Sequence, residues 1–494
     1  MVQMTLLLLS FTATAFASFG PPVRVSQQNL PNHGCNKCAM AIGPGTPSSQ
    51  PVYVVFEDDS AMYVRADIMF QKSTDGGRTW LSTDMLIRRG ERSASNPDIT
   101  TDSDGNVFVV YLADDSMDIH QVWCVRSIDG GATWSAPSRV NDESRGLIGL
   151  IRIVADTAGN LFVAWNQLPG GLSRVFTSVS TDKGATWSPR VCVDDDTLTD
   201  GSANPQVFVQ PGTNHYLVAA TTHRWIGGRS IPCSYFYRST DRGQTFEPGA
   251  QLDTFNWAAV DPHVVADRDH IICDYFGGGF NVPHDTLIAE ARTFYTQGDS
   301  WGSPARVTNL DSLQELYLSG ALALSSDGRV HTALMVDDTA LGYDIYYASS
   351  SDHGASWSGI EPVYVDTILS NWYPDIGVDS AGYVYIVWSH GPSNLGEIWL
   401  STNNPSAIAE EPTRQPISVQ PSATVVRNVL FLAERPSSSA STSSLLDISG
   451  REVMDLKPGA NDIRPLSPGV YFIREGLGTR GEGLGKTQKV VVTR

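Results

Sequence analysis

Charged residues make up only 18% of the 494 residues, and basic residues are the scarcer kind, with 34 Lys and Arg against 53 Asp and Glu. The resulting net charge of −19 repels phosphate groups and anionic headgroups. This shortage excludes nucleic acid and anionic membranes as expected partners. Apolar residues still amount to 41%, which excludes a disordered chain and predicts a folded core.

The sequence has no long apolar run after residue 17, so no membrane-spanning segment is expected in the mature chain. Before that point, residues 5–17 are apolar and end in the small-x-small pattern Ala15-Phe16-Ala17. The pattern is typical of a signal peptide over residues 1–17, although no Lys or Arg precedes the run; a buried strand is the alternative. We therefore expect a protein that is secreted or attached to the cell surface after export.

Cysteine is also scarce, with six residues in the whole chain. His33, Cys35 and Cys38 have a spacing that could suit a metal, but zinc needs four ligands and no second pair is evident. In an exported protein we expect a disulfide there instead. The other four lie inside strand-like runs and are predicted to be buried: Cys124, Cys192, Cys233 and Cys273.

Turn formers are abundant, with 44 Gly and 28 Pro, and one motif recurs: Ser73-Thr-Asp75-Gly-Gly77-Arg-Thr-Trp80. In such a motif the Asp accepts hydrogen bonds from the N–H groups of a tight turn, the Gly takes a positive φ, and the aromatic packs under the hairpin. The motif therefore joins the last two strands of a four-stranded unit. Further copies begin at Ser127, Ser180 and Ser239, another runs from Ser351 to Trp357 with its first position shifted, and a worn copy spans residues 296–301.

The spacing of the motif predicts the fold. Asp75, Asp129, Asp182 and Asp241 are 54, 53 and 59 residues apart. Four antiparallel strands in about 50 residues, repeated radially, describe an all-β chain forming a β-propeller over residues 18–404. We count seven blades, or six if the stretch before Val52 is only a loop. The last blade lacks an outer strand, so we expect residues 22–25 to close the ring against residues 397–400.

After Asn404 the composition changes. Residues 405–415 contain Pro and Glu and read as a linker, and residues 436–444 are rich in Ser. Short strand-like runs between and beyond these segments predict a separate small β-sandwich domain over residues 416–494.

The Ser-x-Asp-x-Gly-x-x-Trp repeats resemble the Asp boxes of the sialidase (BNR-repeat) superfamily. The C-terminal segment resembles the sorting domain of the type IX secretion system, in residues 446–453, 466–472 and 489–492. The first resemblance implies a propeller fold. The second implies passage through an outer membrane, with the secretion machinery as a partner of this domain; an ordinary accessory β-domain is the alternative.

The sialidase resemblance implies roles for particular residues. Asp67 is the nearest candidate for the acid/base, with a solvated loop acid as the alternative, and Tyr373 in Tyr373-Pro-Asp-Ile is the candidate nucleophile. Arg224 matches the second arginine of the carboxylate-binding triad, or is an edge charge on a surface loop. The first arginine is replaced by Lys37, which has no guanidinium fork, and Arg152 resembles it only from a different blade.

Polar residues at equivalent positions of the inner strands form a second group of candidates. They are expected to line the axial channel and bind substrate, or to be buried and hydrogen-bonded to one another: Asp98, Arg152, Gln206, His263 and Asp375. No cofactor is expected. Residues 194–196 and Asp200 offer oxygen ligands for a structural Ca²⁺, but a solvated acidic loop explains them as well.

These patterns predict an exported, sialidase-like glycoside hydrolase acting on extracellular glycans. The alternative is a non-catalytic propeller at the cell surface that binds a glycan or a protein.

Overall fold

The computed structural model describes the chain except for residues 1–18, 28–32, 61–65, 90–93, 115–119, 143–145, 147, 195–198, 227, 254–257, 279–286, 308–319, 338–341, 367–368, 392–395, 407–423, 427–428, 433–442, 448–450, 458, 476–486 and 493–494. It divides into two compact units, residues 1–409 and 410–494. The expected signal peptide and most of the expected linker lie outside the described residues.

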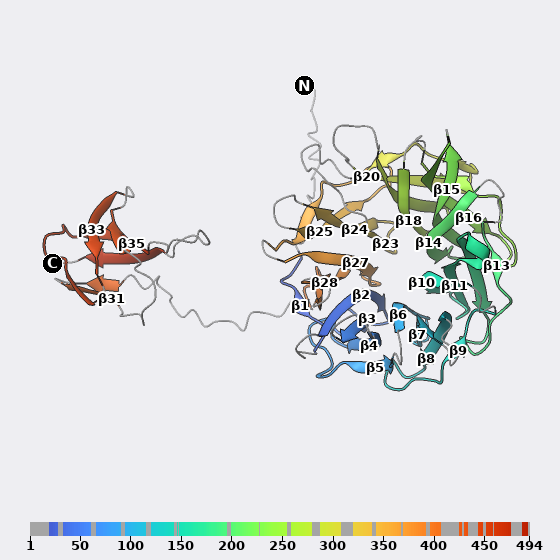
Figure 1. Cartoon of the computed structure of the whole chain (residues 1–494), viewed down its shortest axis with the longest axis horizontal. Coiled ribbons are helices and arrows are strands. Elements are labelled where there is room, and N and C mark those ends of the chain that lie inside the picture. Colours follow the sequence, from blue (N-terminus) through green and yellow to red (C-terminus); the bar gives the residue numbers. More distant parts are fainter. Residues whose placement is uncertain are drawn as a thin grey trace, which may run out of the picture. The chain divides into compact units, whose positions relative to one another are not determined.

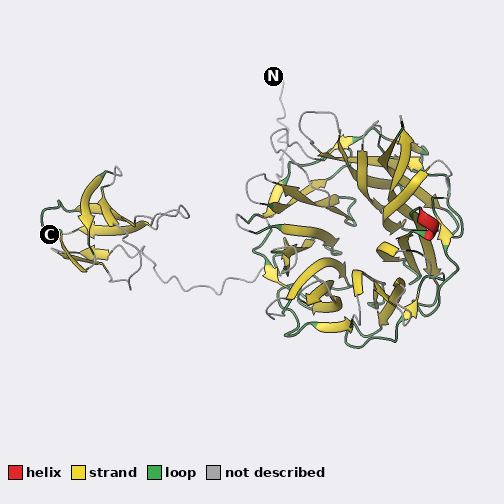
Figure 2. Ribbon diagram, in the orientation of Figure 1, coloured by secondary structure: helices red, strands yellow, loops and turns green. Residues whose placement is uncertain are grey.

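Strands dominate both units, as the sequence predicted, and the described residues hold one short 3₁₀ helix, η1 (Pro169–Gly171) (Figure 2). Seven antiparallel sheets lie within the described part of the first unit (Figure 1). Blade 1 is β2 (His33–Ile42), β3 (Val52–Ser60), β4 (Ala66–Ser73) and β5 (Met85–Arg88); blade 2 is β6 (Ala94–Thr101), β7 (Val107–Asp114), β8 (His120–Ser127) and β9 (Ser138–Arg139); blade 3 is β10 (Ile148–Ala155), β11 (Leu161–Gln167), β12 (Arg174–Ser180) and β13 (Val191–Cys192).

The next three sheets repeat this order. Blade 4 is β14 (Thr199–Val209), β15 (Tyr216–Ile226), β16 (Arg229–Ser239) and β17 (Ala250–Gln251); blade 5 is β18 (Ala258–Ala266), β19 (His270–Gly278), β20 (Leu287–Tyr295), β21 (Ser300–Trp301) and β22 (Ala305–Arg306); blade 6 is β23 (Gly320–Leu324), β24 (Val330–Asp337), β25 (Tyr343–Ser350) and β26 (Glu361–Tyr364). Blade 7 contains β27 (Asn371–Val378), β28 (Val384–His390) and β29 (Glu397–Thr402).

The ring is closed by the N-terminal segment, as the sequence indicated. Strand β1 (Val23–Arg24) pairs antiparallel with β29, with Val23 opposite Leu400 and Arg24 opposite Trp399. Arg24 also forms an ion pair with Glu397, at 3.0 Å. The first strand of each blade lies against the first strand of the next blade, and β27 returns to β2. The first unit is therefore a β-propeller with its inner strands around one axis.

Apolar side chains fill the space between neighbouring sheets. Phe108 and Val110 of β7, for example, belong to one cluster with Ile151 and Trp165 of blade 3, and Trp165 is fully buried. Second strands such as β7 run almost continuously apolar and buried because both of their faces meet another sheet. The core is thus a series of layers between blades.

The repeated motif forms the turn after the third strand of a blade, as expected. In the first copy the Ser73 hydroxyl accepts the Gly77 N–H (2.8 Å), and Asp75 accepts the N–H (2.9 Å) and the hydroxyl (2.6 Å) of Thr79. The copy in blade 6 is not shifted: Ser350 is the residue equivalent to Ser73, because its hydroxyl donates to Asp352 (2.7 Å) and accepts the Gly354 N–H (2.8 Å). We call these turns the Asp boxes.

The described part of the second unit is a small sandwich. Its larger sheet has five strands, β30 (Thr424–Val426), β36 (Thr487–Val492), β35 (Gly469–Glu475), β32 (Ser443–Leu446) and β33 (Glu452–Leu456), and its smaller sheet pairs β31 (Val429–Leu432) with β34 (Gly459–Asp462). Leu430 of the smaller sheet shares a buried cluster with Leu445 and Ile473 of the larger one. The described part of the chain has no helix that could cross a membrane.

Candidate functional site

Most of the inner strands carry a local distortion of the backbone. Five of them contain a residue in the left-handed region, with φ between 39° and 52°, next to a break in the strand register: Lys37, Asn96, Asn204, Asp261 and Tyr373. Asn and Asp adopt this conformation readily, whereas a bulky residue such as Tyr is strained by it. In four of the five a proline follows, which has no N–H to donate to the ladder.

These distorted segments surround a cavity of about 550 Å³ on the propeller axis. Residues of all seven inner strands contribute to its wall. Five of the seven residues that the sequence singled out as site residues line it: Asp98, Arg152, His263, Tyr373 and Asp375. Gln206, the other member of the predicted polar ring, lines it as well.

Two of the cavity aspartates also connect neighbouring blades. Asp98 of blade 2 accepts the N–H of Ile153 in blade 3 at 2.7 Å, and Asp375 of blade 7 accepts the N–H of Met40 in blade 1 at 2.7 Å. Burial raises the pKa of Asp98 to about 7, although Arg152 opposes the shift, and burial also raises the pKa of Asp375. Each carboxyl thus has a structural bond on one side and faces the cavity on the other.

Arg152 is the one arginine on the cavity wall among the described residues. Its Nε donates to Oε1 of Gln206 in the next blade at 3.0 Å, and its Nη1 donates to the carbonyl oxygen of Ile151 at 2.9 Å. Lys37 adds a second cation, with its Nζ 2.9 Å from Oδ1 of Asn96 and 3.5 Å from Oε1 of Glu57. The positive charges are therefore few and already hydrogen-bonded.

His263 lies against a buried carboxylate. Its Nδ1 is 2.9 Å from Oδ1 of Asp274, on the neighbouring strand β19. Burial alone would lower the pKa of His263, but Asp274 outweighs this effect and raises it. Burial raises the pKa of Asp261 in the same part of the wall. The cavity therefore holds groups that can exchange a proton near neutral pH.

Tyr373 is the exposed aromatic residue of the cavity wall. Its side chain is 43% exposed although its backbone is strained, with φ at 51°. Its carbonyl oxygen accepts from the Cys38 thiol at 3.7 Å, and its ring lies 6.4 Å from that of Trp372. Trp372 in turn packs on Tyr343, with ring centroids 4.4 Å apart. An exposed ring backed by two more aromatics forms a surface on which a sugar ring could stack.

The other two predicted site residues do not line this cavity. Asp67 is half-buried at the start of β4, opposite Asp58 of β3. Arg224 lies on β15, where its guanidinium donates to the Tyr235 hydroxyl and packs over the Tyr235 ring. The structure therefore does not bring Asp67 and Arg224 together with Tyr373 in one cavity.

The expected disulfide between Cys35 and Cys38 is wrong, since both are free cysteines, as are the other four. The strand register breaks between Asn36 and Ala39; Cys38 lies within this break, whereas Cys35 precedes it and is paired with Asp58. Cys35 packs in the core between blades 1 and 7, while Cys38 turns toward Tyr373. Burial raises the pKa values of both thiols well above their ordinary range.

Of the acidic side chains after Cys192 that were considered as calcium ligands, the structure describes that of Asp194. Oδ1 of Asp194 accepts the N–H of Val175 at 3.0 Å, and its Oδ2 lies 3.7 Å from the Arg174 guanidinium. Asp194 thus ties a strand in place. Asp195 and Asp196 lie outside the described residues, as does the side chain of Asp200.

Some residues of the cavity were not predicted. Asp261 could have been found, because it precedes Pro262 as Tyr373 precedes Pro374. Trp372 and Tyr343 stand behind Tyr373 and are not among the residues of the cavity wall; they carry no such signal, since their contact depends on how blades 6 and 7 pack.

Comparison with known proteins supports the architecture. The BNR repeat-like domain family matches residues 57–188, which include three of the Asp boxes. No curated protein sequence matches the chain. Among solved structures, an ulvan lyase of polysaccharide lyase family 25 is 10% identical, with a TM-score of 0.51 over 78% of this chain and 94% of that one.

Two further structures resemble the chain more loosely. An α-L-arabinanase from Penicillium chrysogenum is 13% identical, with a TM-score of 0.45 over 78% of this chain and 96% of that one. A Hadza microbial sialidase is 12% identical, with a TM-score of 0.43 over 72% of this chain and 74% of that one. At these identities the likeness extends to the fold alone.

Proposed function

We propose that this propeller acts on a glycan and that the glycan binds in the axial cavity. The observation that carries the proposal is Tyr373, an exposed aromatic ring held in a strained backbone conformation at a polar cavity. Strain of this kind persists where the surrounding structure enforces it, and it gathers at binding and catalytic sites. Aromatic rings beside a few directed polar groups are the usual makeup of such a site.

Glycoside hydrolysis is the chemistry that we propose for the cavity. Tyr373 would be the nucleophile, as the sialidase resemblance implies. The proton donor would be Asp98 rather than Asp67, because Asp98 lines the cavity and burial raises its pKa to about 7. As the Tyr373 oxygen bonds to the anomeric carbon, His263, held by Asp274, would accept the hydroxyl proton while Asp98 protonates the departing oxygen. Water would then release the sugar, giving one proton to Asp98, and His263 would return its proton to Tyr373.

The substrate class follows from the charges. A carboxylate-bearing sugar needs several bidentate cations, and the described cavity wall offers one arginine, already bonded to Gln206. Asp98, Asp261 and Asp375 add negative charge whenever they ionise. We therefore propose an uncharged glycan in place of a sialoside.

A second candidate function is glycan binding without catalysis. It is favoured by the bonds that Asp98 and Asp375 make to backbone N–H groups of neighbouring blades, since such bonds give both residues a structural role. In that case Tyr373 is a stacking surface.

The test is an activity panel run beside a glycan array on the purified chain. The panel holds aryl glycosides of neutral sugars, an aryl sialoside, and a uronic-acid polysaccharide whose cleavage by a lyase is read in the ultraviolet. Cleavage of a neutral glycoside supports the proposal. Cleavage of the sialoside alone contradicts the substrate class, release of unsaturated products contradicts hydrolysis, and array binding without cleavage supports the second candidate.

We also propose that the second unit directs export, with secretion machinery as its partner, and that the propeller works outside the cell. The motivation is the resemblance of residues 446–453, 466–472 and 489–492 to type IX sorting domains. The chain should be produced in a bacterium that has this system, with and without residues 405–494. Retention of the truncated chain in the periplasm is expected; its appearance at the surface would contradict the proposal.

A further inference from the structure

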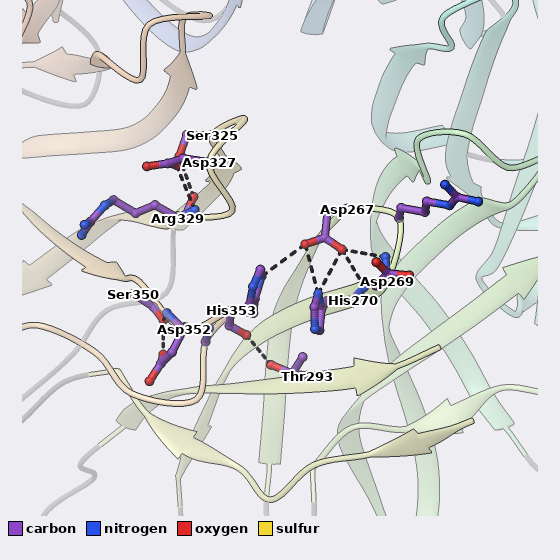
Figure 3. Close-up of polar contacts among 12 residues, drawn as sticks. Asp267, Asp269, His270, Thr293, Ser325, Asp327, Arg329, Ser350, Asp352 and His353 are labelled. Carbon is purple, nitrogen blue, oxygen red and sulfur yellow. Dashed lines mark hydrogen bonds and ion pairs between the residues drawn. The ribbon is translucent and has the colours of Figure 1, made fainter. Parts of the chain in front are cut away.

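Two histidines and an aspartate meet between blades 5 and 6, at the Asp-box end of the propeller (Figure 3). Asp267 lies in the turn between β18 and β19, His270 begins β19, and His353 belongs to the Asp box of blade 6. Nδ1 of His270 is 3.1 Å from both carboxylate oxygens of Asp267, and Nδ1 of His353 is 3.2 Å from Oδ2. The two imidazole rings stack, with centroids 3.9 Å apart.

The junction between blades 2 and 3 shows what this position holds elsewhere. There Asp102 accepts a hydrogen bond from the Asn106 amide at 2.6 Å, and Nζ of Lys183 lies 3.5 Å away. Lys183 has the same place in its Asp box as His353, and their φ values are 58° and 57°. At the junction of blades 5 and 6 the amide and the ammonium group are thus both replaced by imidazoles.

The replacement changes what the carboxylate can do. Asn106 and Lys183 meet the Asp102 carboxylate through N–H donors, and the Lys183 ammonium group has no lone pair with which to bind a cation. The two histidines offer ring nitrogens instead, and one suitable atom from each of the three residues lies within 4.8 Å of the others. Nδ1 of His353 is buried and makes no hydrogen bond. Its contact within the protein is with Oδ2 of Asp267, at 3.2 Å, and a metal ion bound by both residues would take the lone pair of this nitrogen.

The charge and the access also suit a cation. Asp267 supplies a carboxylate whose Oδ1 accepts the N–H groups of Asp269 and His270, both at 2.7 Å, while its Oδ2 is the oxygen 3.2 Å from His353. Asp267 and His353 line an open cavity of about 610 Å³ at this end of the propeller. An ion and its remaining water ligands can enter there.

We propose that Asp267, His270 and His353 bind one divalent transition-metal ion, with zinc the best match. Two imidazole nitrogens and one carboxylate oxygen, with water completing the set, suit zinc, whereas calcium and magnesium prefer oxygen alone. Thr293 holds the Asp-box loop by donating to the carbonyl oxygen of His353 at 2.5 Å. The ion would join blade 5 to blade 6. Asp267 follows the C-terminal end of β18, and none of the three ligands belongs to the wall of the axial cavity. The role of the ion is therefore structural.

The full-length chain, prepared without a histidine tag and stripped with a chelator, should be titrated with zinc chloride while metal content and melting temperature are measured. We expect about one equivalent of bound zinc and a melting temperature that rises with zinc concentration. His353→Lys and His270→Asn introduce the side chains found between blades 2 and 3. Both variants should melt like the stripped wild type and lose the bound equivalent together with the zinc-dependent rise.

His120→Asn is the matched control, because His120 also lies against a carboxylate, Asp114 at 3.2 Å, but no second histidine joins them among the residues that the structure describes. It should bind zinc as the wild type does. The proposal is overturned if the stripped wild type takes up no zinc at micromolar concentration. It is also overturned if both junction variants keep their equivalent, or if the control loses it.

Discussion

The two ends of the propeller each repeat a backbone conformation from blade to blade, but only the Asp-box end also repeats the side chains. At the Asp-box end, the serine hydroxyl lies 2.7 to 2.8 Å from the glycine N–H in every one of five copies. At the cavity end the left-handed backbone recurs with different residues, among them Asn96, Asp261 and Tyr373. The Asp-box end is therefore uniform because it holds each hairpin together, whereas the residues at the cavity end differ from blade to blade.

Tyr373→Phe should have the largest effect, and on activity alone, because it removes a single hydroxyl from the variable cavity end. We expect the variant to fold and melt like the wild type while hydrolysis of a cleaved glycoside falls by about 10²–10⁴, the usual effect of losing one catalytic group. Steady-state rates and a melting curve are the measurements. Equal rates for both proteins would show that Tyr373 is no nucleophile.

Asp75→Asn, at the uniform Asp-box end, should lower stability and leave activity unchanged. The change removes the negative charge that accepts the N–H and the hydroxyl of Thr79, and hydrogen bonds to charged groups contribute about 1.5–3 kcal/mol each. We expect a loss of about 2 kcal/mol in the free energy of unfolding, measured in urea, with catalysis unchanged at temperatures below melting. An unchanged midpoint would contradict the role given to the box.

Asp98→Asn makes the same substitution at the cavity end, where we expect it to raise the stability of the fold instead of lowering it. Burial raises the pKa of Asp98 to about 7, so the folded state binds a proton that the unfolded chain releases near its ordinary pKa. Its contribution to stability is therefore present at low pH and is lost as the pH rises to about 7. The neutral amide can still accept the Ile153 N–H through its oxygen.

We therefore expect Asp98→Asn to melt a few degrees above the wild type at pH 8 and at about the same temperature at pH 4. Melting curves across this range are the measurement. A variant that is less stable than the wild type at pH 8 would show that the ionised carboxylate is needed between blades 2 and 3.

Tyr373→Asn should give the smallest effect. Asn occupies the equivalent position in blades 2 and 4, where it adopts the left-handed conformation with little strain. The substitution should raise the free energy of unfolding by about 1 kcal/mol, and Asn96→Tyr should lower it by a similar amount. If both changes move stability in the same direction, the residue at this position is not setting the strain.

The fold could be predicted because its signals are local. Each Asp box closes its hydrogen bonds within seven residues, from Ser73 to Thr79 for example, so a sequence copy implies a structural copy. The regular spacing then leaves a propeller as the architecture. The N-terminal strand could be predicted because the last blade lacks an outer strand of its own, which leaves residues 22–25 to close the ring.

The candidate site could be predicted only for residues that occupy equivalent positions in the repeated inner strands. Asp98, His263 and Asp375 occupy equivalent places on the inner strands, so their meeting on the axis follows from the ring. Arg224 and Asp67 were placed on strand ends by likeness alone, which does not give the direction of a side chain. The histidine cluster was missed because His270 and His353 belong to different blades and meet only through packing between sheets.

The pairing of β1 with β29 has a consequence for how the molecule is made. The hydrogen bond from the Ile398 N–H to the Ser26 hydroxyl joins residues 372 positions apart, so the first strand to be synthesised finds its partner last. The entropy of closing such a loop grows only by about 0.6 kcal/mol per doubling of its length, so the long separation affects time more than stability. Until β29 has been made, β1 has no partner strand, so the ring cannot close before the last blade is synthesised.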